Sequence, residues 1–348
     1  MKTIRVITVI CWVIISAIFL GLGVWFLTGT VFGIRPAWID RNMPFRVGIG
    51  GVESLTGSFN VVGTYTKDPA GITSIEIDWV SGEITIIPHD GDEIEITESA
   101  QRSLRDDERL SMRVSGDTLE IEFLNRRVSE RIGRMPPKRL EILVPRILSE
   151  NLSSLDINSV SGLVFVEGMS ITEIDIDTTS GKISLSNIIS RDIEANSTSG
   201  AINISDSSSA ILEIDTISGT TTASGAFSNV SIDSTSGAIS LNNTTVQSIA
   251  DIDTTSGTIE LSGAFYNINT DTTSGSVSIR SIIVPSSLNV DTISGSVTVT
   301  IPNEGSITVR HSSTSGRFNS DIPITLQTRG AQFNFSTTSG NVNITELR

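Results

Sequence analysis

The sequence has little cysteine, little histidine and little basic charge, and each shortage excludes a class of protein. One cysteine in 348 residues excludes a disulfide scaffold and a zinc site built from cysteines. Two histidines leave little material for a histidine metal centre or a catalytic triad. With 24 Lys and Arg against 39 Asp and Glu, the net charge is −15. This charge argues against nucleic acid as a partner, because phosphate binding needs a basic surface.

One long hydrophobic run is present, at residues 6–27, and it carries no charge. As a helix it would span ~33 Å, enough to cross a bilayer core. It is longer than the core of a cleavable signal peptide and lacks a small-residue cleavage site, which favours an uncleaved anchor. Lys2 and Arg5 precede the run and favour a cytoplasmic N-terminus. We therefore expect a single-pass cell-membrane protein with an extracytoplasmic bulk.

A Ser-Gly pair recurs through the rest of the chain at intervals of about 19 residues. Its glycines are Gly162, Gly181, Gly200, Gly219, Gly237, Gly257, Gly275, Gly295, Gly316 and Gly340, and an earlier copy ends at Gly82. Apolar residues predominate seven and five positions before the glycine, and two and four positions after it. This period of two on both sides of the glycine predicts two short strands per repeat.

One repeat offers about four aliphatic side chains, each worth roughly 1.5–3 kcal/mol when buried, against ~1–2 kcal/mol of backbone entropy per ordered residue. A single repeat therefore cannot fold alone, whereas stacked repeats cover one another. The sequence predicts an all-β fold, a parallel β-solenoid of about 19 residues per coil, behind one N-terminal transmembrane helix. We expect an anchor at 1–28, a spacer at 29–70, an irregular N-terminal β region at 71–150 and regular repeats at 151–348.

The Ser-Gly pair itself predicts a tight corner in each coil. Glycine is expected there because a positive φ is costly for any residue with a Cβ. The serine before the glycine, and the Ser or Thr that usually stands three positions before it, are both expected to point inward.

Acidic residues recur four positions before the glycine and form a predicted outward ladder. Its members are Asp177, Asp215, Asp233, Asp253, Asp271 and Asp291. Neighbouring carboxylates in such a ladder repel by about 1 kcal/mol per pair in water. Two interpretations remain open: calcium coordinated by the carboxylates, and local capping of turn N–H groups. Because Asn and Ser fill the same position in other repeats, capping is favoured and no metal or cofactor is predicted.

Basic residues gather in one segment near the middle of the chain. They are Arg126, Arg127, Arg131, Arg134, Lys138 and Arg139. An anionic surface such as lipid headgroups or wall polymer is one interpretation, and a solvated loop is the other. Neither His89 nor His311 is paired with a plausible nucleophile, so no catalytic residue is predicted.

The repeat, written [IV]-D-[ST]-[TIV]-S-G-x-[IV], stands behind a membrane helix and resembles the bacterial "putative adhesin" family of β-strand-repeat proteins, a domain of unknown function. The resemblance covers about residues 70–348. It implies a right-handed, β-helix-like fold, an envelope location and a role in adhesion or envelope stress, and it carries no catalytic residues. We expect a non-enzymatic surface scaffold that binds a cell-wall polymer, a cationic peptide or a partner protein. An envelope-stress regulator and a carbohydrate-active β-helix enzyme are the alternatives.

Overall fold

A computed structural model describes residues 58–123, 135–324 and 330–347. The predicted membrane anchor at 6–27 and most of the predicted spacer lie outside these residues. Within the described ranges, no helix has the length and hydrophobicity needed to span a bilayer.

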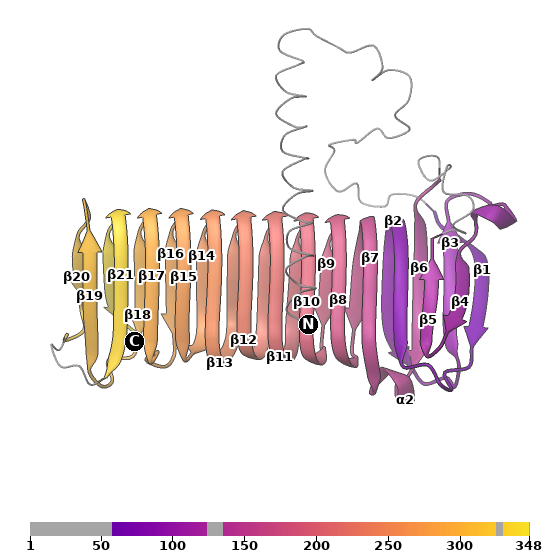
Figure 1. Cartoon of the computed structure of the whole chain (residues 1–348), viewed down its shortest axis with the longest axis horizontal. Coiled ribbons are helices and arrows are strands. Elements are labelled where there is room, and N and C mark those ends of the chain that lie inside the picture. Colours follow the sequence, from indigo (N-terminus) through magenta and orange to yellow (C-terminus); the bar gives the residue numbers. More distant parts are fainter. Residues whose placement is uncertain (1–57, 124–134, 325–329, 348) are drawn as a thin grey trace, which may run out of the picture. The chain divides into compact units, whose positions relative to one another are not determined.

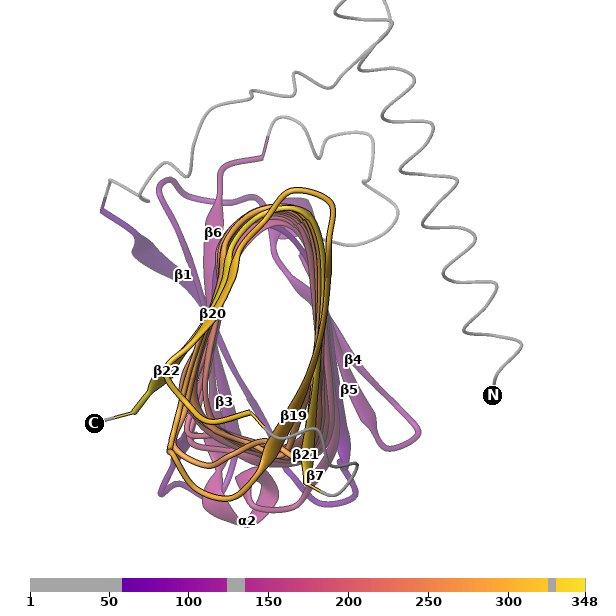
Figure 2. The ribbon, with the colours of Figure 1, turned by 90° about the vertical axis from the view of Figure 1, so that its left-hand side faces the viewer.

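The described residues form one continuous sheet of 22 strands, wound into a flattened coil with two broad walls (Figures 1 and 2). The first wall contains the segments that precede each corner glycine, and the second wall contains the segments that follow it. The five longest strands, β2, β7, β11, β12 and β13, pass around a corner and belong to both walls. The fold is therefore a parallel β-solenoid, as the repeat predicts.

In spatial order the first wall consists of β4 (Ser111–Ser115), β5 (Thr118–Glu122), β2 (Ser74–His89), β7 (Leu152–Glu167), β8 (Ser170–Ser180), β10 (Ile189–Ser199), β11 (Ile202–Ser218), β12 (Thr221–Ser236), β13 (Ile239–Ser256), β15 (Asn267–Ser274), β17 (Ser287–Ser294), β21 (Ala331–Ser339) and β19 (Ile307–Ser313). The second wall adds β1 (Asn60–Lys67), β3 (Ile94–Ala100) and β6 (Lys138–Pro145) before β2 and β7, and then β9 (Ile183–Ser186), β14 (Ile259–Phe265), β16 (Val277–Ser281), β18 (Val297–Ile301), β22 (Val342–Glu346) and β20 (Phe318–Ser320). Two short helical turns, η1 (Asp106–Glu108) and α2 (Arg146–Ser149), complete the described structure.

The core is a set of stacked aliphatic columns between the two walls. In the coil around Gly181, the inward residues Ile174, Ile176, Ile183 and Leu185 are all completely buried. Register pairing aligns each of them with its counterpart in the neighbouring coils, for example Ile174 with Ile193. The alternation seen in the sequence therefore gives one unbroken core along the rod.

The corner hydroxyls divide between the inside and the outside of the rod. The residues three positions before the glycine point inward; Thr178, Thr216 and Thr254, for example, are 3–6% exposed. The serines directly before the glycine are exposed at every described corner after Gly82, which corrects the prediction that both hydroxyls face inward. The reason is local: the chain turns at the Ser-Gly pair, so the alternation stops one residue before the glycine.

The corner glycines are required by close stacking of the backbone and not by a left-handed conformation at every turn. The angle φ is 149–154° at Gly181, Gly219 and Gly237, but it is not positive in this sense at Gly200 or Gly257. At all five positions, a Cβ would lie 1.8–1.9 Å from the carbonyl oxygen of the glycine one coil earlier. A methyl group cannot fit between coils at this spacing, and this corrects the reason predicted for the glycines.

The last repeat in the sequence is not the last coil in space. β21 pairs with β17 on one side and β19 on the other, so the coil formed by β21 and β22 lies between two coils that precede it in sequence (Figure 1). Stacking in sequence order would instead leave β21 and β22 at the end. In the observed order, Phe333 and Phe335 are 0% and 2% exposed. Stacking in sequence order would instead bury His311, which stands in register with Phe335, and this would remove less apolar area from water.

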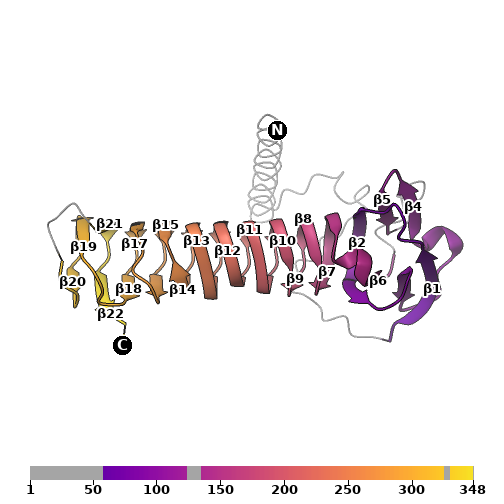
Figure 3. The same ribbon diagram turned by 90° about the horizontal axis from the view of Figure 1, so that it is seen from below.

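The N-terminal end of the rod has a different construction. There β1 pairs with β3 and β3 pairs with β6, both antiparallel, while β4 pairs with β5 as an antiparallel hairpin. These strands broaden this end of the rod (Figure 3). β1 also occupies part of the segment predicted as a spacer at 29–70.

Candidate functional site

The six predicted ladder aspartates lie on the outside of the first wall and stack in register. Asp215, Asp233, Asp253, Asp271 and Asp291 pair directly from coil to coil, without interruption. Asp177 stands two coils earlier, separated from Asp215 by Asn196. Adjacent strands lie ~4.8 Å apart, so each carboxylate has a like-charged neighbour at close range. We call this set the carboxylate column.

A second outward column runs beside it, two residues earlier in each coil. Its members, in spatial order, are Glu76, Asp156, Asp175, Glu194, Glu213, Ser231, Asp251, Asn269, Asn289 and Asn334. Acidic residues predominate in the first half of this column, whereas amides predominate in the second half. The two columns together form what we call the acidic face.

The environment of the acidic face raises the pKa of several of its aspartates. The pKa of Asp175 is raised to about 7, first by removal of water and then by the charges of Asp177 and Glu194. Removal of water, followed by the charges of their own neighbouring carboxylates, raises the pKa of Asp156, Asp215 and Asp253 to about 6. A nearby positive charge would lower these raised pKa values, because it stabilises the ionised carboxylates.

Few positive charges in the described structure offset this repulsion. No described Lys or Arg forms an ion pair with the five consecutive members of the carboxylate column. Some carboxylates of the second column accept hydrogen bonds from asparagine side chains of the same face. Asn158 donates to Asp156 at 2.9 Å, and Asn269 donates to Asp251 at 2.7 Å. Among the described residues, no group of three or more His, Cys, Asp or Glu is arranged to hold a metal ion.

The outside of the second wall carries a different surface. Its outward residues are mainly Ser, Thr and Asn, and they hydrogen bond from coil to coil. Thr222 donates to Asn203 at 2.6 Å, and the hydroxyls of Thr300 and Thr345 lie 2.9 Å apart. The two walls share one core, yet only the first is strongly acidic.

The predicted basic patch is divided by the structure. Arg126, Arg127, Arg131 and Arg134 lie outside the described residues. Lys138 is completely buried, so it belongs to no exposed patch, and this corrects the prediction for that residue. Arg139 pairs with Glu83 at 3.0 Å and stacks over the Phe59 ring at 4.3 Å. The alternation of β6 explains the difference, because its first residue points inward.

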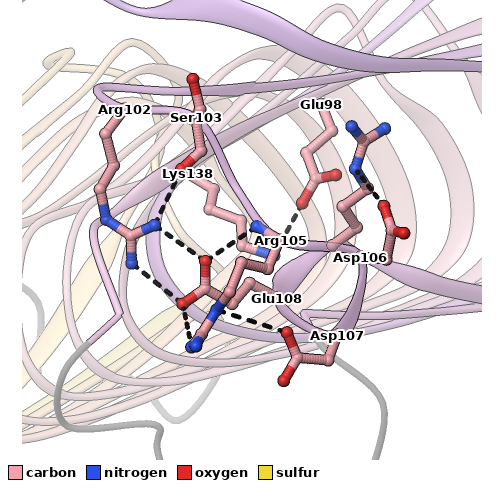
Figure 4. A network of polar contacts seen from close by, with 9 residues as sticks. Glu98, Arg102, Ser103, Arg105, Asp106, Asp107, Glu108 and Lys138 are labelled. Atoms are coloured by element: carbon pink, nitrogen blue, oxygen red, sulfur yellow. Dashed lines mark hydrogen bonds and ion pairs between the residues drawn. The ribbon is translucent and has the colours of Figure 1, made fainter.

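Lys138 belongs to a buried polar cluster at the N-terminal end (Figure 4). Its Nζ donates to Glu98 Oε1 at 2.7 Å and to the Phe123 carbonyl at 2.5 Å, and it lies 4.3 Å from the centre of the Phe123 ring. Leu110 N–H also donates to Glu98 Oε1, at 3.0 Å. Burial lowers the pKa of Lys138. This pair is enclosed by packed residues and is positioned to hold the end strands together.

A second charged group lies beside this pair. Arg102 and Arg105 each donate to the Glu108 carboxylate at 2.8 Å, and hydrogen bonding with Arg102 is the main cause that lowers the pKa of Glu108 to about 2. One irregularity of the repeat marks this cluster in the sequence: Trp79 replaces the usual Ser or Thr three residues before the glycine. Trp79 packs edge-on against Phe123 at 4.9 Å.

The two histidines lie in unrelated places. His89 accepts from Gly91 N–H at its Nδ1 and contacts the Glu93 carbonyl through Nε2, at 2.8 Å, within its own turn. His311 lies at the opposite end of the rod, 5.4 Å from the Phe318 ring. The structure does not bring these two residues together.

The parallel solenoid and its acidic wall place this protein in the class of β-strand-repeat proteins with an extended, repetitive surface. The chain belongs to the family described as Toastrack DUF4097, whose model matches residues 72–281 and 226–345. The expected resemblance to a β-repeat domain of unknown function is thereby confirmed.

Several solved structures are similar to this chain over most of its length. A "putative adhesin" of Parabacteroides distasonis shares 11% identity over 83% of this chain and 98% of its own, with a TM-score of 0.44. A "putative lipid binding protein" of the same species shares 15% identity over 82% and 96%, with a TM-score of 0.40. A "putative adhesin" of Bacteroides fragilis shares 10% identity over 82% and 96%, with a TM-score of 0.34. No curated protein sequence matches this chain significantly.

Proposed function

We propose that this protein is a non-enzymatic scaffold whose acidic face binds a cationic partner. The observation that carries the proposal is the run of five stacked aspartates from Asp215 to Asp291, without ion pairs to described Lys or Arg. Such a run costs stability, and a partner with several positive charges relieves this cost at every coil. A cationic peptide, or a cationic stretch of a cell-wall polymer or a partner protein, has the required chemistry.

The absence of an enzymatic activity is part of the proposal. The outward positions repeat the same residue types from coil to coil, which suits an extended contact better than one reaction centre. A catalytic site needs a few groups in a unique geometry, and an array of equivalent carboxylates offers instead many similar contacts for one long ligand.

Attachment to the cell membrane is also part of the proposal, through the apolar run at residues 6–27 with the rod outside the cell. The charge-free length of that run supports it. Protease treatment of intact cells tests the orientation: digestion of the repeats without lysis is expected, and protection until lysis would contradict it.

Binding is tested with a fluorescent lysine-rich peptide and the purified repeat-containing chain. The triple variant Asp215→Asn, Asp233→Asn, Asp253→Asn is expected to weaken binding about tenfold. Each exposed charge pair with the peptide contributes roughly 0.2–1 kcal/mol, and the variant removes three of them. The matched control removes three carboxylates located elsewhere, in Glu167→Gln, Asp206→Asn, Glu260→Gln. Equal weakening in both triple variants would show that net charge alone is responsible, and it would overturn the assignment to the acidic face.

A further inference from the structure

The five consecutive aspartates of the carboxylate column form a row along the rod. Register pairing joins each aspartate directly to the next, from Asp215 to Asp291. Seen along the rod, these coils lie almost directly behind one another (Figure 2), so the row is nearly straight. At ~4.8 Å per strand spacing, its four intervals cover ~19 Å. A partner that pairs with the whole row must therefore repeat its positive charges at about this spacing.

Over these five coils the negative charge is concentrated in this single row. The second column of the acidic face contributes only two carboxylates there, Glu213 and Asp251. Its other members in these coils are the uncharged Ser231, Asn269 and Asn289. The geometry therefore favours a partner with one line of positive charges over a partner with a broad basic surface.

An uncharged column borders the other side of the aspartate row, two residues later in each coil. Over the same five coils its members are all exposed, and they are Ile217, Thr235, Thr255, Thr273 and Ile293. Isoleucine stands only in the first and last of these coils, where Ile217 is 39% and Ile293 is 55% exposed. Each end of the aspartate row thus has an aliphatic side chain beside it, which an apolar group of a partner would cover.

The spacing of the row distinguishes between the conformations that a cationic segment could adopt along it. An α-helix presents one residue per turn on one face, every ~5.4 Å, so four turns cover ~22 Å. An extended chain presents alternate residues on one face, every ~6.7 Å, so four intervals cover ~27 Å. Centred on the row, the helix is out of register by ~1 Å at each end, and the extended chain by ~4 Å. Flexible Lys and Arg side chains accommodate the first mismatch far better than the second.

A helix also offers a second face for the uncharged column. Successive residues of a helix are rotated by ~100°, so the residue after each cation lies on the adjacent face. Apolar residues there would contact the isoleucines at the two ends of the row while the cations face the aspartates. An amphipathic helix thus matches both columns at once.

We propose that the partner of the acidic face is an amphipathic α-helix that lies along the rod over the five coils from Asp215 to Asp291. Its Lys or Arg residues, one per turn, pair with the aspartates, and its adjacent apolar residues contact Ile217 and Ile293. This inference rests on the proposed function, because it specifies the partner of that same site.

Three fluorescein-labelled, alanine-rich peptides of about 18 residues test the helix, with binding to the intact chain measured by fluorescence anisotropy. The first carries five lysines spaced alternately four and three residues apart, which form one stripe on a helix, and a leucine after each end lysine. The second has the same composition with its lysines distributed around the helix. The third has the first sequence with two central alanines replaced by proline, which breaks the helix.

The second and third peptides are expected to bind at least about tenfold more weakly than the first, because each places fewer lysines opposite the aspartates. Circular dichroism is expected to show that the helical content of the first peptide increases when it binds.

Variants of the protein locate the helix. The double variant Ile217→Ser, Ile293→Ser is expected to weaken binding of the first peptide about fivefold. The same variant is expected to leave unchanged the binding of a peptide whose two leucines are replaced by alanine. The matched control is Ile189→Ser, Ile282→Ser, which removes two isoleucines that are each 62% exposed and belong to neither column. It is expected to leave the binding of both peptides unchanged, and melting checks that both double variants are folded.

Failure of this inference is distinguishable from failure of the proposed function. If all three peptides bind equally well and the aspartate triple variant weakens each of them, the partner is cationic but not helical, and this inference is overturned. Equal effects of the two isoleucine double variants would overturn the placement of the helix beside Ile217 and Ile293. If none of the peptides binds, both the inference and the proposed function are overturned.

Discussion

Replacing one corner glycine by alanine tests whether backbone stacking determines the corner. In Gly257→Ala the new Cβ would lie 1.9 Å from the carbonyl oxygen of Gly237, whereas carbon and oxygen in packed interiors approach to about 3.3–3.6 Å. The two coils must therefore separate locally by ~1 Å or more. The hydrogen bond from Gly237 N–H to the Ser256 carbonyl, now 3.1 Å, joins the two coils at this point and would be lost or weakened.

The expected cost follows from these two effects. Forced separation of packed groups costs about 1–3 kcal/mol, and a lost backbone hydrogen bond costs about 1 kcal/mol. Reduced freedom of the unfolded chain offsets about 0.4–1 kcal/mol of this. We expect Gly257→Ala to lower the free energy of unfolding by about 2–3 kcal/mol, measured by urea denaturation, and to lower the Tm by roughly 5 °C.

Gly162→Ala is the matched control. Neither glycine has a positive φ, so conformational strain is absent from both substitutions. At Gly162 the new Cβ meets the Ser159 hydroxyl at 2.8 Å and the Gly82 carbonyl oxygen only at 3.4 Å, and the hydroxyl can rotate away. We expect a loss below about 1 kcal/mol. Equal losses in the two variants would refute the stacking explanation of the corner glycines.

Three further predictions concern the carboxyls, the inward hydroxyls and the buried ion pair. Folding raises the pKa of Asp175 to about 7 from its ordinary value near 4. Between pH 4 and pH 7 the folded protein therefore keeps a proton on Asp175 that the unfolded chain has lost, so the free energy of unfolding should increase as the pH falls from 7.5 to 4.5. Thermal melting should show a Tm that rises over this range, and Asp175→Asn should reduce the slope of Tm against pH. Thr254→Val should raise stability by about 1 kcal/mol, because the Thr254 hydroxyl is buried without a partner, whereas Thr255→Val on the exposed side should be neutral; a destabilised Thr254→Val would contradict this. Lys138→Met should cost about 3–5 kcal/mol in denaturant titration by leaving the Glu98 carboxylate buried and unpaired, and Glu98→Leu added to it should recover most of that loss; no recovery would mean that the pair itself stabilises the end.

The coil and its core follow directly from the sequence because they depend on a pattern of period two that repeats many times. Each inward position, such as Ile176 or Leu185, is determined by the same local alternation and by the need to exclude water. The outward position of the carboxylate column follows from the same alternation. Its unbroken register follows from the nearly constant repeat length.

Features that depend on a single coil could not be predicted in this way. Simple repetition does not reveal that β21 and β22 lie between earlier coils, because both orders align the same columns and differ mainly in the burial of Phe333 and Phe335. The inward position of Lys138 is also hidden, since its partner Glu98 is distant in sequence and the segment between them is irregular. Short, non-repeating pairings of this kind require the three-dimensional structure.

The separation of inward and outward columns explains how this fold leaves its surface available for function. Aliphatic columns and corner glycines determine the coil, so an outward residue contributes little to it. Asn196 and Ser336 occupy the carboxylate column in other coils without altering the strand register. The coil therefore does not need aspartate at this position, and five consecutive aspartates repel one another by about 1 kcal/mol per pair in water. A costly feature that the coil does not require supports the proposal that the acidic face binds a cationic partner.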